Sequence, residues 1–234
     1  ICNDPMTESM NLITQKDLKS IINRYTASLK KFLASDTIGT ITTVKPGQEQ
    51  LFTALEYIIG QCLGAFTACV LVYIHYLPHW SKTDDEKVKL GVFATSPSVS
   101  SKWSNLNSEL IGTFILLFGL KFIGINDFAQ GLNPIVVGAL VCAIGISLGG
   151  TTGYAINPVR DFIPRLSHSI LPIKGKGNSN FSYSWVPVIG PVVGGVLGVN
   201  LYEFLFENTI NIYLYISLAI FFLVTSLSLI ENRN

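Results

Sequence analysis

The sequence predicts an all-α membrane protein: a bundle of transmembrane helices with one shorter helix that enters the bilayer without crossing it. Of its 234 residues, 49% are hydrophobic and only 13% are charged, whereas a soluble chain carries about 25% charged residues. The charges crowd into the stretches 4–49, 82–102 and 174–176, which leaves long apolar runs between them. Buried helices of a soluble core are the alternative, but too little polar sequence is left to cover so many apolar runs.

Five apolar runs are long enough, or nearly long enough, to cross a bilayer. A spanning helix needs about 20 mostly apolar residues to cross a hydrocarbon core of ~30 Å. Glycines four residues apart within these runs would let neighbouring helices approach closely in lipid; they are Gly60 and Gly64, Gly145 and Gly149, and Gly190, Gly194 and Gly198. We therefore expect helices over residues 54–77, 105–125, 132–149, 184–206 and 210–230.

The first 53 residues are of a different kind. They are polar, rich in Ser, Thr and Lys, and contain no apolar run of spanning length. Asp17 to Leu33 could form a short amphipathic helix with its apolar residues on one side. The sequence thus divides into a polar segment outside the bilayer (1–53), a transmembrane region (54–208) and a hydrophobic tail helix (209–234).

The charge balance and the histidines argue against several function classes. A net charge of +1 gives no electrostatic attraction for nucleic acid. His75 and His79 lie four residues apart, but Pro78 between them should break a shared helical face. His168 has no nucleophile partner near it in the sequence. We therefore expect no metal, no cofactor, no enzyme activity and no binding of nucleic acid.

The segment 149–172, GGTTGYAINPVRDFIPRLSHSILP, carries the functional signal. It is apolar enough to lie at membrane depth, yet it contains Arg160, Asp161 and Arg165 and is too broken to span. Non-helical backbone is tolerated in a bilayer only where it is buried in protein or lines a water-filled cavity. Charged residues at that depth mark solute paths. An extramembrane loop followed by a surface helix is the alternative.

The local chemistry of this segment predicts a loop that descends into the membrane and then starts a half-helix. Asn157 is a favoured N-cap, Pro158 a favoured first residue, and Asp161 a carboxylate near the positive end of the helix. A helix that starts at mid-membrane directs its positive dipole end and an amide donor toward a pore. Such a field repels cations and protons, while fixed donors favour neutral hydroxylated solutes.

Asn-Pro-Val-Arg-Asp at 157–161 resembles the second signature, Asn-Pro-Ala-Arg-Asp, of the major intrinsic proteins, the aquaporins and glycerol facilitators. Further matches surround it: Gly-Tyr-Ala-Ile at 153–156, Leu-Pro-Ile-Lys-Gly-Lys-Gly at 171–177, Trp-Val-Pro-Val-Ile-Gly-Pro at 185–191 and Ser-Glu-Leu-Ile-Gly-Thr-Phe at 108–114. The resemblance extends from about Tyr57 to Phe206. It implies an aquaporin-like helical bundle with a re-entrant half-helix, in the cell membrane.

Within that family the sequence resembles the aquaglyceroporin, or glycerol uptake facilitator, branch. Asp161 directly after Arg160 resembles the glycerol-conducting members, and Gly145 falls where water-selective members place a constricting histidine. The resemblance implies a passive transmembrane channel for glycerol, similar small polyols and other small uncharged solutes, with water as a further permeant. It also implies a homo-oligomer, namely a tetramer.

The resemblance assigns roles to individual residues as well. Arg160 would donate hydrogen bonds to solute hydroxyls, Tyr154 would offer an aromatic wall to the carbon edge of the solute, and Gly145 would leave width. Asn157 would donate its amide at the pore centre. Glu109 would accept hydrogen bonds from the backbone of the re-entrant loop.

The sequence departs from the family pattern in three places. The family fold is an inverted repeat of two halves, and residues 1–53 offer no counterpart to the first two helices and half-helix. Val159 replaces the alanine of the signature and adds branched bulk where two half-helices should touch. The tail 210–230 has no counterpart in the family.

These departures leave open a second hypothesis, a truncated or diverged membrane protein that keeps the half-fold without conducting. A secondary transporter is disfavoured, because no second interrupted helix appears in the sequence.

Overall fold

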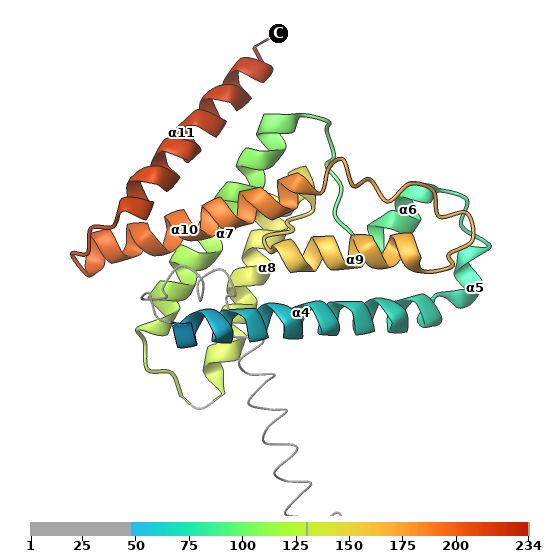
Figure 1. Ribbon diagram of the computed structural model, residues 1–234, viewed down its shortest axis with the longest axis horizontal. Coiled ribbons are helices and arrows are strands. Elements are labelled where there is room, and N and C mark those ends of the chain that lie inside the picture. The colour runs from blue at the N-terminus through green and yellow to red at the C-terminus, as the bar shows by residue number, and fades with distance from the viewer. Residues whose placement is uncertain (1–47, 130, 234) are drawn as a thin grey trace, which may run out of the picture. The chain divides into compact units, whose positions relative to one another are not determined.

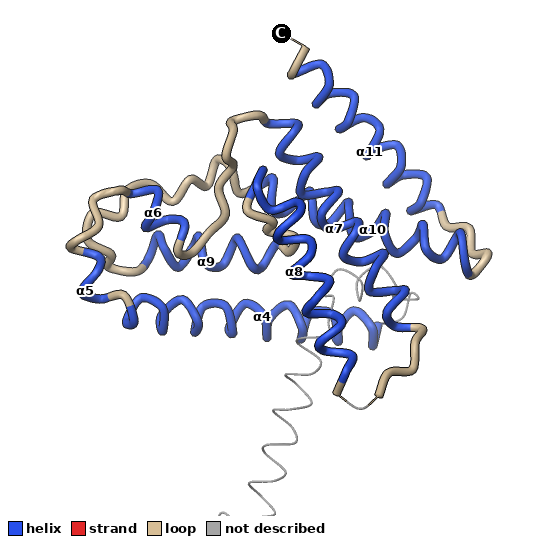
Figure 2. Tube along the Cα trace, turned by 180° about the vertical axis from the view of Figure 1, so that it is seen from behind, coloured by secondary structure: helices blue, strands red, loops and turns tan. Residues whose placement is uncertain are grey.

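The computed structural model describes residues 48–129 and 131–233, with side chains from residue 54 onward. Every regular element in these ranges is a helix (Figures 1 and 2). Five helices are long and apolar enough to cross a membrane: α4 (Gln48–His75), α7 (Lys102–Gly124), α8 (Leu132–Thr152), α10 (Trp185–Phe206) and α11 (Ile212–Glu231). The predicted all-α membrane fold is confirmed, while the helix considered for Asp17 to Leu33 lies outside the described residues.

Three shorter helices complete this part of the chain. The predicted half-helix is α9 (Pro158–Ile170), and α5 (Leu77–Trp80) and α6 (Glu86–Gly91) lie between α4 and α7. α4 ends at His75, earlier than expected, because the chain turns at Tyr76 so that Pro78 can enter the first turn of α5. α8 continues past Gly149 to Thr152 and ends where Gly153 adopts a left-handed conformation at φ 82°.

The most extensive helix pair is α7 with α10. Gly190, Gly194 and Gly198 form a stripe along α10 where it meets α7. A Cβ added at Gly198 would lie 2.8 Å from the carbonyl oxygen of Phe114, and one at Gly194 would overlap the carbonyl of Leu110. The predicted small-residue stripe therefore brings the two backbones into direct contact.

The remaining helices pack around this pair. α8 and α11 pack against α7, α11 also packs against α10, and α9 lies beside both α4 and α10; Figures 1 and 2 show α9 alongside α4. The second predicted stripe behaves differently, because an added Cβ at Gly60 or Gly64 has no described atom within 4 Å. That face of α4 is open within the described part of the chain.

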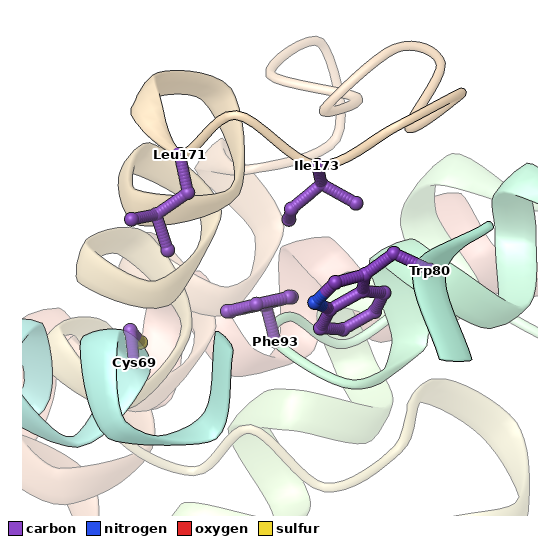
Figure 3. Packing of buried hydrophobic residues seen from close by; sticks show 5 residues of the cluster. All are labelled: Cys69, Trp80, Phe93, Leu171 and Ile173. Atoms are coloured by element: carbon purple, nitrogen blue, oxygen red, sulfur yellow. The ribbon is translucent and has the colours of Figure 1, made fainter. Parts of the chain in front are cut away.

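An apolar cluster fixes the C-terminal end of α9. Leu171 and Ile173, which directly follow α9, pack with Cys69 of α4, Trp80 of α5 and Phe93 after α6 (Figure 3). The rings of Trp80 and Phe93 are stacked with their centroids 5.9 Å apart. The end of the half-helix is thereby joined to the connection between α4 and α7.

The α7–α10 contact predicts that Gly194→Ala destabilises the protein. The added methyl group meets backbone, which cannot rotate away, and overpacking of this kind costs about 1–3 kcal/mol. In a protein of this size, about 1 kcal/mol lowers Tm by roughly 2–4 °C. The measurement is the thermal unfolding midpoint of purified protein in detergent.

Gly138→Ala on α8 is the matched control, because nothing lies within 4 Å of a Cβ added there. Its Tm should be unchanged or slightly higher, since alanine favours the helix over glycine. Equal Tm values for the two variants would contradict the close approach of α7 and α10.

Candidate functional site

The N-terminus of α9 is formed by its own cap residue. The Oδ1 atom of Asn157 accepts hydrogen bonds from the backbone N–H of Val159 at 2.8 Å and of Arg160 at 3.3 Å, and Pro158 is the first helical residue. The other side of the same amide donates from Nδ2 to Oε1 of the buried Gln61 on α4, at 3.4 Å. The start of the helix is therefore fixed by its own cap residue, and the side-chain amide nitrogen of Asn157 faces α4.

The re-entrant loop, residues 153–157, is held by the carboxylate of Glu109 on α7, which is 1% exposed. Its Oε1 accepts from Thr152 Oγ1 at 2.6 Å and from the backbone N–H of Ala155 at 3.0 Å, and its Oε2 accepts from that of Ile156 at 2.8 Å. Tyr154 and Ile156 adopt left-handed backbone conformations at φ 42° and 45°, which cost about 1–3 kcal/mol each in residues other than glycine. The three hydrogen bonds offset this strain.

Arg160, Tyr154 and Gly145 come together on one side of the re-entrant loop. The guanidinium carbon of Arg160 lies 5.6 Å from the ring centroid of Tyr154, within the range of a cation–π contact. A Cβ at Gly145 would lie 3.1 Å from the tyrosine ring, and one at Gly149 would lie 2.7 Å from it. These two glycines, one of the predicted small-residue pairs, make room for the ring. Arg160 and Tyr154 are both exposed within the described chain.

Asp161 and Arg165 form a fully buried ion pair on the opposite side of α9. Arg165 Nε donates to Asp161 Oδ1 at 2.9 Å, and Nη2 donates to Oδ2 at 3.0 Å. The remaining N–H groups reach backbone carbonyls, from Nη2 to Thr95 at 2.7 Å and from Nη1 to Ser179 at 2.9 Å and Asn180 at 3.2 Å. A guanidinium has five N–H donors, so each of them has an acceptor.

This pair, with its partners at Thr95 and 179–180, forms what we call the arginine clasp. Asp161 also accepts hydrogen bonds from both the backbone N–H and the hydroxyl of Thr95, at 2.8 and 2.6 Å. The ring of Tyr183 lies beneath the guanidinium, with its centroid 5.8 Å away. The clasp joins α9 to the segment after α6 and the segment before α10.

Sequence reasoning missed the arginine clasp. The i,i+4 spacing of Asp161 and Arg165 on a predicted helix was the available signal for their pairing.

Two lysines support the far end of α9. Lys176 Nζ donates to the carbonyl oxygens of Ser169 at 2.6 Å and Leu171 at 2.8 Å. These carbonyls lie at the C-terminal end of the helix, where a cation also interacts favourably with the helix dipole. The buried Lys89 of α6 donates to the carbonyls at 174–175, at 2.7 and 2.8 Å. Both ammonium groups therefore stabilise the chain that leaves α9.

No metal centre is found in the part of the chain that the structure describes. There, no three side chains of His, Cys, Asp or Glu gather where they could hold a metal ion.

The arginine clasp predicts that Arg165→Lys lowers the stability of the protein. Lysine has three donors instead of five and cannot pair with Asp161 in the planar two-bond geometry. Buried acceptors left without donors cost about 1–3 kcal/mol. Thermal unfolding in detergent should show a lower Tm for this variant.

The matched control is Arg160→Lys in the same helix, because Arg160 is exposed and its side chain makes no hydrogen bond to the described residues. This variant should keep the parental Tm. If both arginines tolerate lysine equally, the clasp does not stabilise α9 as described.

Comparison with known proteins identifies the family that the chain resembles. The sequence profile of the family described as "Major intrinsic protein" matches residues 37–202. The chain is 60% identical over 150 residues to the "Probable glycerol uptake facilitator protein" of Thermotoga maritima, covering 64% of each chain. It is 56% identical over 155 residues to the "Glycerol uptake facilitator protein" of Bacillus subtilis, covering 66% of this chain and 57% of that one.

A solved structure is similar in both sequence and fold. The X-ray structure of the aquaglyceroporin from Plasmodium falciparum matches with a TM-score of 0.59 and 30% sequence identity, over 74% of this chain and 71% of that one. The chain spans only part of the two bacterial relatives: 64% of the length of the Thermotoga maritima protein and 57% of that of the Bacillus subtilis protein.

Proposed function

The chain belongs to the major intrinsic protein family, and on that premise we propose that it forms a passive channel for glycerol and other small uncharged solutes, including water. It is an integral membrane protein with five helices of spanning length and composition among its described residues. The cell membrane is its location, as the family assignment implies. The high identity to two glycerol uptake facilitators supports glycerol as the permeant.

The observation that carries the proposal is the position of Arg160 at the first turn of α9, over the ring of Tyr154, which itself packs against Gly145. A guanidinium offers fixed N–H donors and keeps its charge at any physiological pH. In our proposal these donors bind the hydroxyl groups of a polyol, while Tyr154 contacts its carbon edge. Because Gly145 has no side chain, the Tyr154 ring can lie back against α8, and in our proposal this leaves the width that a three-carbon solute needs.

The positive charge of Arg160, at the start of α9, explains why cations are excluded in our proposal. The positive end of the α9 dipole and the Arg160 guanidinium both repel a passing cation. In the proposed channel Asn157 donates its amide at the centre of the path, and Glu109 supports the loop from behind. A neutral solute meets the donors without the electrostatic barrier.

The open faces of two helices support a homo-oligomer, which we propose is a tetramer. In the 18-residue apolar stretch of α4, only 11% of the residues are buried within the described chain. In the corresponding stretch of α8, only 6% are buried. Such faces contact lipid or other protein in a membrane. We further propose that residues 54–208 form the channel region, that 1–53 lie outside the bilayer, and that 209–234 form an additional hydrophobic tail helix.

The proposed function predicts that Arg160→Ala reduces the selectivity of glycerol transport. Removing the guanidinium takes away charge-assisted hydrogen bonds worth about 1.5–3 kcal/mol each, so preference for glycerol over a larger polyol should fall roughly tenfold or more. Leakage of protons and sodium should rise, because the positive barrier is lost. The measurement is reswelling of vesicles after an osmotic step, with ion leak followed by a pH-sensitive dye.

Arg233→Ala removes an exposed arginine at the end of the chain and is the matched control; it should behave as wild type. Wild-type vesicles that reswell no faster than protein-free vesicles would refute conduction by this chain. Wild-type conduction with unchanged selectivity in Arg160→Ala would refute the role of Arg160 alone.

A further inference from the structure

The tail helix α11 lies beyond the residues that match the family profile, which end at 202. It nevertheless packs against α7 and α10. Its buried Leu214 belongs to an apolar cluster with Leu110 and Leu197, and Val224 belongs to a second with Leu106 and Val186. The tail is therefore built into the bundle, and its contacts with α7 are polar as well as apolar.

The carboxylate of Glu231, at the end of α11, caps the start of α7. The first N–H groups of a helix have no partner within the helix, and the N-cap residue Ser101 makes no side-chain bond to them. Glu231 Oε1 instead accepts from the N–H of Lys102 at 2.9 Å, and Oε2 accepts from that of Trp103 at 2.9 Å and from Ser101 Oγ at 2.8 Å. A carboxylate here also interacts favourably with the helix dipole.

Two further polar pairs continue from this cap along α7. Ser104 Oγ lies 2.8 Å from Ser228 Oγ, and Thr225 Oγ1 donates to Asn107 Oδ1 at 3.2 Å. Each step of three residues forward along α7 is thus matched by a step of three back along α11. This polar ladder fixes the two helices in one antiparallel register, because sliding α11 by one turn would separate all the pairs at once.

The ladder lies on the helix that carries Glu109. Leu106 and Leu110, on either side of Glu109 along α7, both belong to the clusters that α11 completes. A shift of α7 by one residue moves its side chains about 1.5 Å along the axis and about 100° around it. The bonds from Glu109 to Ala155 and Ile156 are 3.0 and 2.8 Å long and tolerate no such movement.

We propose that α11 is a positioning helix for the re-entrant loop. Its ladder, and Glu231 above all, fixes the axial position and rotation of α7, and α7 holds the loop through Glu109. The consequence for transport rests on the proposed function, whereas the register of α11 and the position of the loop do not. Loss of Glu231 therefore loosens a loop that Glu231 does not touch.

The register is tested by disulfide formation in a variant whose four native cysteines are replaced by alanine. The pair Ser104→Cys and Ser228→Cys should cross-link on mild oxidation, since the two hydroxyl oxygens lie 2.8 Å apart. The pair Ser104→Cys and Ser226→Cys is the control, because Ser226 is exposed on another side of α11. Equal cross-linking of both pairs, or none in the first, would overturn the proposed register.

The effect on the loop is tested by the reaction rate of a cysteine placed at the buried position 155 with a thiol reagent in the same background. Ala155→Cys is expected to react slowly, because Ala155 is 0% exposed. Adding Glu231→Ala should raise that rate about tenfold, as expected for the loss of one helix cap, and the 104–228 disulfide should restore the slow rate. Asp84→Ala, which removes an exposed carboxylate elsewhere, should have no effect.

An unchanged rate in Glu231→Ala would overturn the positioning role of α11, whether or not the chain conducts. If the wild type conducts, Glu231→Ala should also lower the preference for glycerol over a larger polyol, and oxidation of the 104–228 pair should restore it. A wild type that does not conduct would overturn the proposed function, and the labelling rate would still decide the role of the tail.

Discussion

The architecture around α9 depends on one buried carboxylate, that of Glu109. Non-helical backbone is tolerated inside a membrane only where it is buried in protein or lines a water-filled cavity, and Glu109 accepts hydrogen bonds from the backbone N–H groups of Ala155 and Ile156 in the re-entrant loop. Its own place is set by the close contact of α7 with α10, since a Cβ at Gly190 would lie 2.7 Å from the Glu109 Cβ. The glycine stripe on α10, the carboxylate and the strained loop therefore form one connected arrangement.

A second buried interaction fixes α9 from the other side. The arginine clasp uses every donor of Arg165 and joins three separate segments of the chain. With the loop held at its start and the clasp holding its body, α9 has little freedom to move or rotate. Arg160 and Tyr154 are then presented in a fixed geometry, so that in the proposed channel no binding free energy is lost to ordering the site.

The sequence predicted those features whose causes are local. Apolar runs predicted the five long helices, and the Asn157–Pro158 pair predicted where α9 begins. The clasp and the capping of α7 by Glu231 escaped prediction because they join residues far apart in the chain, and because the acceptors of Arg165 are largely backbone carbonyls, which every residue carries. The open face at Gly60 and Gly64 also could not be predicted, because the spacing of glycines does not say which stripe packs against another helix. The functional roles of Arg160, Tyr154, Gly145 and Asn157 came from the family resemblance and are proposals.

The most direct test of the account is whether the re-entrant loop lines a water-filled path. In a cysteine-free background, Tyr154→Cys in vesicles should react with a small, charged, membrane-impermeant thiol reagent, and glycerol should slow that reaction. Ile146→Cys, 83% exposed on the apolar helix α8, should stay unmodified because it faces apolar surroundings. An unreactive cysteine at 154, or equal reaction at both positions without any effect of glycerol, would contradict the account.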